Sequence, residues 1–404
     1  MIPLLAGWFM FGTFPAEWEP QESVWMSWAT YENKRGYSVH AVQREMIHAL
    51  GPETKVDLLV RPNQLAQARK FLGKAPHVRF HLSANNEIWT RDFGPIFVKN
   101  PNGTLQPVTY KFNYWGYTDV NDQMSKAEDA VDAQFGRQAV RGTSTMLLNA
   151  PIISEGGNRE FNGKGTMIVV ESVEKQRNPG KLREELETEH KRYLGVDRVI
   201  WLPHGGLEDD LTFMGPLDGG KEGDVYTVIA TGGHVDNVAR FVNVNTVLLA
   251  EVTLEDAQKS PIAWASRNRL EQNWRTLRRA APDLKIIRMP VPDPMITTMS
   301  PGDGVYDYIK DLNYAKKPFP KGKPIKVIQA ASYLNFLISN GKIITSKFYK
   351  PGRPIGLKAK DAKALQILKE AFPGYKIIAI DSEAINLGGG GIHCITQQMP
   401  TSRK

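Results

Sequence analysis

A turn-and-hairpin pattern that recurs along the chain constrains its fold more than any other feature of the sequence. In each copy a small-residue turn leads into two apolar runs, separated by a hairpin signal such as Asn-Gly or Asn-x-Thr. Because one such unit cannot bury its own apolar face, we expect about five units to close around a shared axis, with their turns pointing inward. Four copies are complete and a fifth is cut short by the C-terminus; they span residues 91–108, 155–172, 232–252, 331–348 and 388–400.

Helical patterns alternate with short apolar runs around these units, which predicts an α/β fold. Apolar residues with a 3.6-residue period predict helices at residues 38–51, 62–73, 181–195, 262–280 and 361–374. Each is followed by a short run that is typical of a buried strand, at residues 55–60, 78–83, 198–203, 284–292 and 375–381.

Two segments interrupt the repeat. Residues 209–227 and 300–322 are rich in glycine, proline and charged residues, which is typical of surface loops. We therefore expect a single domain over residues 1–404, with surface inserts near these two segments.

Composition and charge limit the partners of the chain. Lys and Arg outnumber Asp and Glu by 51 to 43, but the basic residues are scattered and no nucleic-acid motif accompanies them. The apolar stretch 1–14 is too short to span a bilayer, and the first basic residue is Lys34, so the n-region of a signal peptide is missing. We expect this stretch to pack on the body and the protein to be cytoplasmic, without a nucleic-acid or membrane partner. A processed leader, an exported form and homo-oligomerisation are left open.

The only cysteine, Cys394, follows four glycines near the end of the chain, which excludes an intramolecular disulfide and a cysteine-rich zinc site. A lone cysteine is often just a small buried hydrophobe. If the recurring turns converge, however, it meets Asp92, Glu155, His234 and Asp236 in one cavity. A nucleophile, a base and carboxylates are the groups that covalent catalysis by an activated thiol requires.

The carboxylates point to the class of substrate. Buried anions repel one another and lose hydration, so they favour a cationic ligand with several N–H donors. A guanidinium fits, because each of its planar N–H edges can meet a carboxylate, and its charge lowers the pKa of a nearby thiol. The thiolate of Cys394 can attack the central carbon, while His234 protonates the departing amine and then activates water. The products are a urea-type compound and ammonia, without a metal or an organic cofactor.

Each of these residues also has a plainer interpretation. Asp92 can belong to a surface ion pair, and Glu155 can be a charge at a strand end. His234 and Asp236 can form a capped turn or part of a metal site. His393 is expected to point away from its neighbour if the segment is extended, which favours a structural histidine.

Six segments in order along the chain have a specific pattern. They are "FPAEWEPQESVWMSW" (14–28), "WTRDFGPIFV" (89–98), "EGGN" (155–158), "GHVDNVARFVN" (233–243), "ASYLNFLISNG" (331–341) and "GGGGIHCITQQMP" (388–400). These segments resemble agmatine deiminases of the guanidino-modifying pentein superfamily, which also includes the bacterial peptidylarginine deiminases. The resemblance implies a five-bladed, pseudo-symmetric α/β propeller of ββαβ-type units. It also implies hydrolysis of agmatine to N-carbamoylputrescine and ammonia.

The same resemblance implies a role for each matching residue. Cys394 is expected to be the nucleophile, His234 the acid and base, and Glu155 the acidic partner of the histidine. The expected substrate-binding residues are Asp92, Asp236, Trp89 and Gly391. No metal or organic cofactor is expected, and the partner is a small guanidino substrate.

Three alternatives are left open. A peptidylarginine deiminase would use the same chemistry on an arginine-containing peptide, converting protein arginine to citrulline. A metal-dependent hydrolase would use His234 and Asp236, although no third ligand has a spacing typical of such sites. A non-catalytic binding protein on the same scaffold would not need the intact set of cysteine, histidine and carboxylates.

Overall fold

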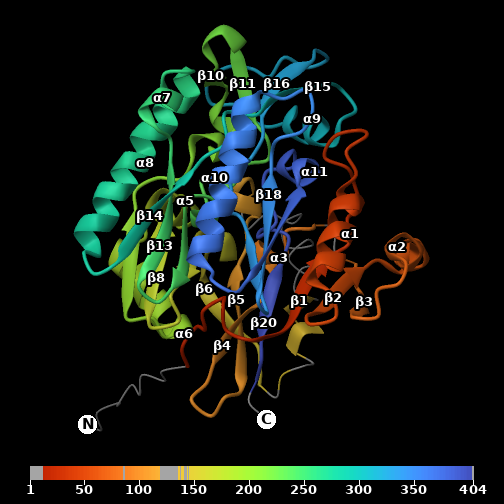
Figure 1. The fold of residues 1–404 in the computed structure, drawn as a ribbon, viewed down its shortest axis with the longest axis vertical. Coiled ribbons are helices and arrows are strands. Elements are labelled where there is room, and N and C mark those ends of the chain that lie inside the picture. Colours follow the sequence, from red (N-terminus) through yellow and green to blue (C-terminus); the bar gives the residue numbers. More distant parts are fainter. Residues whose placement is uncertain are drawn as a thin grey trace.

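The computed structural model describes residues 12–84, 87–118, 135–136, 138–140, 143 and 145–402. Within them the fold is mixed α/β, as the alternation of helices and strands predicts, and the strands form six small sheets. Figure 1 shows α8 (Pro261–Ala280) at the left of the strands, α10 (Ile355–Ala371) in front and α1 (Val39–Leu50) at the right. The apolar N-terminal stretch that was expected to pack on the body lies largely outside the described residues.

Four of the sheets repeat one pairing pattern. Their first two strands form an antiparallel hairpin, and the third strand runs parallel to the second. These hairpins coincide with the four complete copies of the turn-and-hairpin pattern, so the predicted hairpins are confirmed. Sheet by sheet, the strands are β4 (Ile96–Lys99), β5 (Leu105–Lys111) and β6 (Leu148–Ile153); β7 (Glu160–Phe161), β8 (Thr166–Val170) and β9 (Arg198–Leu202); β12 (Ala239–Asn243), β13 (Thr246–Glu251) and β14 (Lys285–Pro290); β17 (Leu337–Ser339), β18 (Lys342–Lys347) and β19 (Lys376–Asp381).

A fifth sheet joins the two ends of the chain. The C-terminal strand β20 (Gln397–Pro400) is antiparallel to β1 (Gln21–Ser27), and β1 is parallel to β2 (Lys55–Val60), which is parallel to β3 (Val78–Leu82). Figure 1 shows β20 and β1, blue and red, next to one another. The incomplete fifth copy of the pattern is therefore completed by a strand from the N-terminal part of the chain.

Local sequence explains how several elements begin and end. Asn340 and Gly341, between β17 and β18, have φ values of 42° and 77°, the positive values that a two-residue hairpin turn needs. Helix α1 begins after Ser38, whose side chain accepts a hydrogen bond from the amide of Ala41, and it ends at Gly51, which has a φ of 63°.

The sixth sheet corrects the expectation that both inserts are surface loops. Strands β10 and β11 lie within the first insert and α9 within the second, and both Val225 and Tyr306 are buried. Glycine, proline and charged residues surround these short elements, so no periodicity identified them. The sheet has the order β10 (Leu217–Asp218), β11 (Asp224–Thr227), β16 (Ile325–Ile328), β15 (Ile296–Met299), and α9 spans Gly304–Ile309.

The five predicted helices are present, with small differences at their ends. The largest difference is in α10, which begins six residues before the predicted start at 361, because the early Gly356 weakened the helical pattern. The other α-helices are α2 (Leu65–Leu72), α3 (Thr90–Phe93), α5 (Glu171–Arg177), α6 (Arg183–Leu194), α7 (Leu254–Ala257) and α11 (Glu383–Asn386). Short 3₁₀ helices are η1 (Pro62–Gln64), η2 (Tyr114–Gly116), η3 (Gly156–Asn158), η4 (Leu207–Asp209), η5 (Thr212–Met214), η6 (Gly220–Glu222) and η7 (Val235–Asn237).

The turns that carry the candidate residues occupy equivalent places in the fold. Each lies directly before the strand that opens a copy of the repeat: α3 before β4, η3 before β7, η7 before β12, residues 331–336 before β17 and residues 388–396 before β20. The repeat therefore supplies polar side chains from five distant parts of the sequence to one region.

Candidate active site

Cys394 is enclosed, and polar groups from two other turns contact its thiol. Only 2% of the residue is exposed. The amide Nδ2 of Asn335 donates to Sγ at 3.1 Å, and the thiol donates to Asp236 Oδ2 at 3.5 Å. Burial, together with the carboxylates of Asp236 and Asp92, raises the pKa of the Cys394 thiol well above its usual range. The thiol is therefore protonated unless a positive charge enters the site.

The glycines before Cys394 allow close packing around the thiol. Gly389 has a φ of 111°, and a Cβ at Gly390 would lie 2.5 Å from the ring of Trp89 and 3.1 Å from the sulfur of Cys394. A Cβ at Gly391 would instead lie 2.5 Å from Asn335 Oδ1. Trp89 thus borders the thiol, whereas Gly391 faces the side chain that orients it; the expected contact of each with a substrate stays a prediction.

His234 lies between two carboxylates and is completely buried. Its Nε2 is 3.4 Å from Glu155 Oε2, and its Nδ1 is 3.7 Å from Asp92 Oδ1. Burial alone would lower the pKa of His234, but the carboxylates of Asp92, Glu155 and Asp236 outweigh it and raise this pKa to about 9. At neutral pH the ring is an imidazolium, which can donate a proton.

Glu155 is held in its charged form by a buried arginine. Its Oε1 accepts a hydrogen bond from Arg177 Nε at 2.7 Å. Burial raises the pKa of Glu155, yet the guanidinium of Arg177 and the ring of His234 lower it to about 2. The pair of Glu155 and His234 is therefore a carboxylate and an imidazolium across a wide pH range.

The backbone of His234 is fixed by Asp209, which the sequence placed at the edge of a surface insert. That placement is wrong, because only 1% of Asp209 is exposed. Its carboxylate accepts hydrogen bonds from the amides of Thr231 at 2.8 Å and His234 at 3.2 Å. Asp209 thus fixes the turn from which the imidazole projects.

The carboxylates of Asp92 and Asp236 have different surroundings. Asp92 Oδ2 accepts from Trp115 Nε1 at 2.8 Å, and Oδ1 accepts from the amide of Gly157 at 3.0 Å. Asp236 Oδ2 accepts from His393 Nδ1 at 2.8 Å, while its buried Oδ1 has no hydrogen-bond partner within the described chain. Burial and the charge of Asp236 raise the pKa of Asp92, whereas His393 lowers the pKa of Asp236 despite burial.

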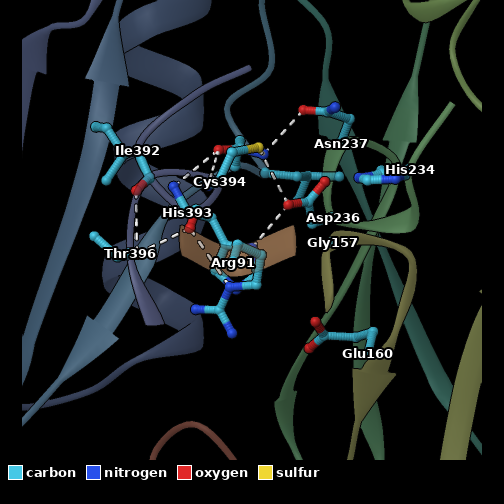
Figure 2. A network of polar contacts seen from close by, with 12 residues as sticks. Arg91, Gly157, Glu160, His234, Asp236, Asn237, Ile392, His393, Cys394 and Thr396 are labelled. Atoms are coloured by element: carbon cyan, nitrogen blue, oxygen red, sulfur yellow. Dashed lines mark hydrogen bonds and ion pairs between the residues drawn. The ribbon is translucent and has the colours of Figure 1, made fainter. Parts of the chain in front are cut away.

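Gly157 lies where His234 and both aspartates approach one another. A Cβ at this position would be 2.5 Å from His234 Nδ1, 2.9 Å from Asp92 Oδ1 and 3.2 Å from Asp236 Oδ2. Figure 2 shows Gly157, His234 and Asp236 facing the same region. Glycine is therefore required here because any side chain would collide with the charged groups.

The segment that contains His393 is a turn rather than an extended strand, so the premise for its predicted direction is wrong. The hydroxyl of Thr396 donates to the carbonyl oxygens of Ile392 at 3.2 Å and His393 at 2.9 Å. As a result the His393 ring and the Cys394 thiol both contact Asp236 (Figure 2).

The described part of the chain contains no group of three or more His, Cys, Asp and Glu side chains arranged to hold a metal ion. None of its helices is both long and apolar enough to cross a membrane. His234 pairs with Glu155 and Asp92, and Asp236 pairs with His393, so the two residues of the "GHVDN" segment face different partners.

Several residues of the site were missed by the sequence analysis. Asn335 lies in a recurring turn, so the convergence of the turns could have identified it. Trp115 and Arg177 come from η2 and α5 rather than from these turns, and no sequence signal marks them. The same is true of Asp209, whose neighbours suggest a loop.

Comparison with known proteins decides the family. The sequence model of the Porphyromonas-type peptidyl-arginine deiminase family matches residues 13–215 and 217–400. The chain belongs to this family. Agmatine deiminase of Pseudomonas syringae pv. tomato is 32% identical over 396 residues, covering 96% of each chain. Agmatine deiminase of Pseudomonas aeruginosa UCBPP-PA14 is 32% identical over 401 residues, again covering 96% of each chain.

Solved structures share the fold. Agmatine deiminase of Enterococcus faecalis superimposes with a TM-score of 0.72 at 26% identity and covers 96% of each chain. C. jejuni agmatine deiminase has a TM-score of 0.70 at 20% identity, and the match covers 98% of each chain. At this identity the comparison shows only that the folds are similar. The family resemblance drawn from the motifs is confirmed, and the chain is a deiminase-type hydrolase that acts on a guanidino C–N bond.

Proposed function

We propose that this protein hydrolyses agmatine to N-carbamoylputrescine and ammonia through a covalent thiouronium on Cys394. The observation that carries the choice of a small substrate is the burial of the whole constellation. Of Cys394, His234, Glu155, Asp92 and Asp236, none is more than 6% exposed. An arginine inside a peptide carries backbone on both sides, which agmatine lacks, so an enclosed site favours the smaller molecule. The Pseudomonas relatives named above are agmatine deiminases.

In the first step the guanidinium binds between Asp92 and Asp236. The carboxylate of Asp92 accepts its N–H groups, and so does Oδ1 of Asp236, which has no hydrogen-bond partner among the described residues. Gly157 has no side chain that would cover these carboxylates. The cation lowers the pKa of the Cys394 thiol, whose proton leaves to solvent as the guanidinium enters. Exchange of one positive charge for another keeps the net charge of the buried site unchanged.

The covalent step uses the thiolate and the imidazolium together. Sulfur of Cys394 attacks the central carbon and forms a C–S bond. His234 transfers its proton to an amino nitrogen, the C–N bond breaks, and ammonia leaves. The S-alkyl thiouronium remains on the enzyme with the aminobutyl tail attached.

The second half regenerates the enzyme. His234, now neutral, removes a proton from a water molecule that attacks the same carbon. The C–S bond breaks and the thiolate departs. The remaining proton of the attacking water then passes to the thiolate, so that the neutral urea-type product and the Cys394 thiol form. Glu155 stabilises the imidazolium that this step restores, since its Oε2 is 3.4 Å from Nε2. In this scheme Trp89 and Gly391 border the substrate.

Competition among agmatine, free arginine and a blocked arginine peptide tests the substrate. We expect agmatine to be preferred by at least about tenfold in kcat/KM. Polar groups that pair with its terminal ammonium would be left unpaired when free arginine or the blocked peptide binds. A clear preference for the peptide would select the peptidylarginine alternative and leave the deiminase chemistry standing.

We also propose that the repeat closes as a single five-bladed propeller domain. Five sheets share the antiparallel and then parallel pairing, and β20 joins the last copy to β1. Contacts between side chains of distant turns, such as Cys394 with Asp236 and His234 with Glu155, support one body rather than separate domains.

A further inference from the structure

A buried histidine joins the candidate site to the segment before β1. His393 Nδ1 is 2.8 Å from Asp236 Oδ2, and His393 Nε2 is 2.8 Å from Glu17 Oε1. His393 is completely buried, and the side chain of Glu17 is 13% exposed. Figure 2 shows His393 next to Cys394 in the same turn, to one side of Asp236.

Both ring nitrogens of His393 face carboxylate oxygens, Nδ1 that of Asp236 and Nε2 that of Glu17. His393 lowers the pKa of both carboxylates against the effect of burial, in Glu17 with the help of Arg240 and Arg91. The ring therefore links the two carboxylates through both of its nitrogens.

Glu17 is itself held from the opposite side. Arg240 Nη2 lies 2.6 Å from Glu17 Oε2, and Arg91 Nη1 lies 3.3 Å from Glu17 Oε1. Arg240 Nε also pairs with Glu160 at 2.9 Å. The charged groups around His393 are thus Asp236, Glu17 and the two arginines behind Glu17, and the ring has little freedom to turn.

The position of Asp236 follows from this contact. Its Oδ2 is occupied by His393 and lies near the thiol, whereas Oδ1 is a buried oxygen without a hydrogen-bond partner among the described residues. Without His393 the carboxylate could rotate about its Cβ–Cγ bond to angles at which neither oxygen keeps its present direction.

We propose that His393, braced by Glu17, is a positioning residue that holds the carboxylate of Asp236 with Oδ1 directed at the guanidinium. The inference rests on the proposed function, because it takes Asp236 as the group that accepts hydrogen bonds from a guanidino or amidino cation. His393 does not touch the reacting atoms and acts through Asp236.

Two substitutions of the same residue separate positioning from general structure. His393→Asn keeps an amide N–H near the place of Nδ1, next to Asp236, and loses the link to Glu17. His393→Gln keeps an N–H near the place of Nε2, next to Glu17, and loses the link to Asp236. We expect His393→Gln to reduce kcat/KM by about 10- to 100-fold, as for other groups that orient a ligand-binding side chain, mainly through KM. His393→Asn should have a kcat/KM much closer to the wild-type value than that of His393→Gln.

The rate at which Cys394 is alkylated gives a measurement that should not depend on the charge of the reagent if His393 only stabilises the fold. Chloroacetamidine is a cation whose N–H groups can pair with Asp236, whereas iodoacetamide is neutral. Both lose a halide as the sulfur attacks their methylene carbon. The ratio of the chloroacetamidine rate to the iodoacetamide rate should fall by about tenfold or more in His393→Gln, because Asp236 is no longer oriented toward the cation. It should stay near the wild-type value in His393→Asn.

A second pair of variants covers the case in which His393 variants fail to fold. Glu17→Gln and Glu160→Gln each replace a carboxyl group that contacts Arg240, but of the two only Glu17 contacts His393. The rate ratio should fall in Glu17→Gln and not in its matched control Glu160→Gln.

The outcomes distinguish the inference from the proposed function. An unchanged ratio in His393→Gln, or equal losses with both reagents in all variants, overturns the positioning role even if agmatine is turned over normally. A ratio that falls as expected in a protein that turns over no guanidino substrate supports the positioning role and refutes the proposed substrate class instead.

Discussion

Glu155→Gln tests the electrostatic account of the acid and base. The substitution preserves the shape of the side chain and removes one of the carboxylates that raise the pKa of His234 to about 9. An opposite charge within about 4–6 Å shifts a pKa by about 1–3 units, and Glu155 Oε2 lies 3.4 Å from the ring. The pKa of His234 should therefore fall to between about 6 and 8. Arg177, left beside a neutral amide, shifts this pKa in the same direction.

The magnitude follows from the protonated fraction of His234. At about pH 8 this fraction is about nine-tenths for a pKa of about 9, and it falls to between about a half and about a hundredth for a pKa of about 8 to 6. The ratio of variant to wild-type kcat/KM should then decline with rising pH, and at about pH 8 it should be about 2- to 90-fold below its acidic limit. Because His234 donates its proton as an imidazolium, the decline must occur as pH rises.

The assay is ammonia release at low substrate concentration from about pH 5.5 to 10, the range that brackets both pKa values. Asp57→Asn is the matched control, because Asp57 is a buried carboxylate that pairs with His81 at 2.7 Å in the sheet of β1, β2 and β3. Its kcat/KM ratio to the wild type should not change with pH. A Glu155→Gln ratio that is flat with pH, or that rises, would refute the assignment of His234 as the proton donor.

Other perturbations test the geometry of the site. Gly157→Ala should abolish activity, because its Cβ would lie 2.5 Å from His234 Nδ1, whereas Gly356→Ala, where the nearest atom is 3.8 Å away, should leave kcat/KM unchanged and stabilise α10. Trp115→Phe removes the 2.8 Å hydrogen bond to Asp92 and should reduce kcat/KM by about 10- to 150-fold, since hydrogen bonds to charged groups contribute about 1.5–3 kcal/mol. Normal kcat/KM in this variant would show that the indole does not position the carboxylate. Dialysis against EDTA should leave turnover unchanged; a loss that zinc or manganese restores would favour a metallohydrolase.

The periodic parts of the fold could be predicted from the sequence because they depend on local patterns. The hairpin of β17 and β18 follows from the positive φ values of Asn340 and Gly341, and α1 follows from its cap at Ser38 and its apolar face. The pairing of β20 with β1 depends on contacts across almost the whole chain, and no local pattern encodes it.

The candidate site divides in the same way. Cys394, His234 and the carboxylates lie in recurring turns, so the convergence of the repeated turns identifies them. Several of the partners that contact them come from outside the turns. Trp115 contacts Asp92 from η2, and Glu17 contacts His393 across 376 positions of sequence. Asp209 was assigned to a loop because its neighbours are polar, yet its carboxylate replaces water as the acceptor for buried amides.

The central claim, covalent deimination at Cys394, is tested most directly by the mass of a trapped intermediate. His234→Ala slows both the departure of ammonia and the attack of water, so an adduct that forms during a long incubation with agmatine should persist after an acid quench. The account predicts one adduct whose mass is that of agmatine less one ammonia. Proteolytic mapping should place it on Cys394, and it should be absent from a variant that also carries Cys394→Ser. Turnover by Cys394→Ser alone, or an adduct that maps to another residue, would contradict the account.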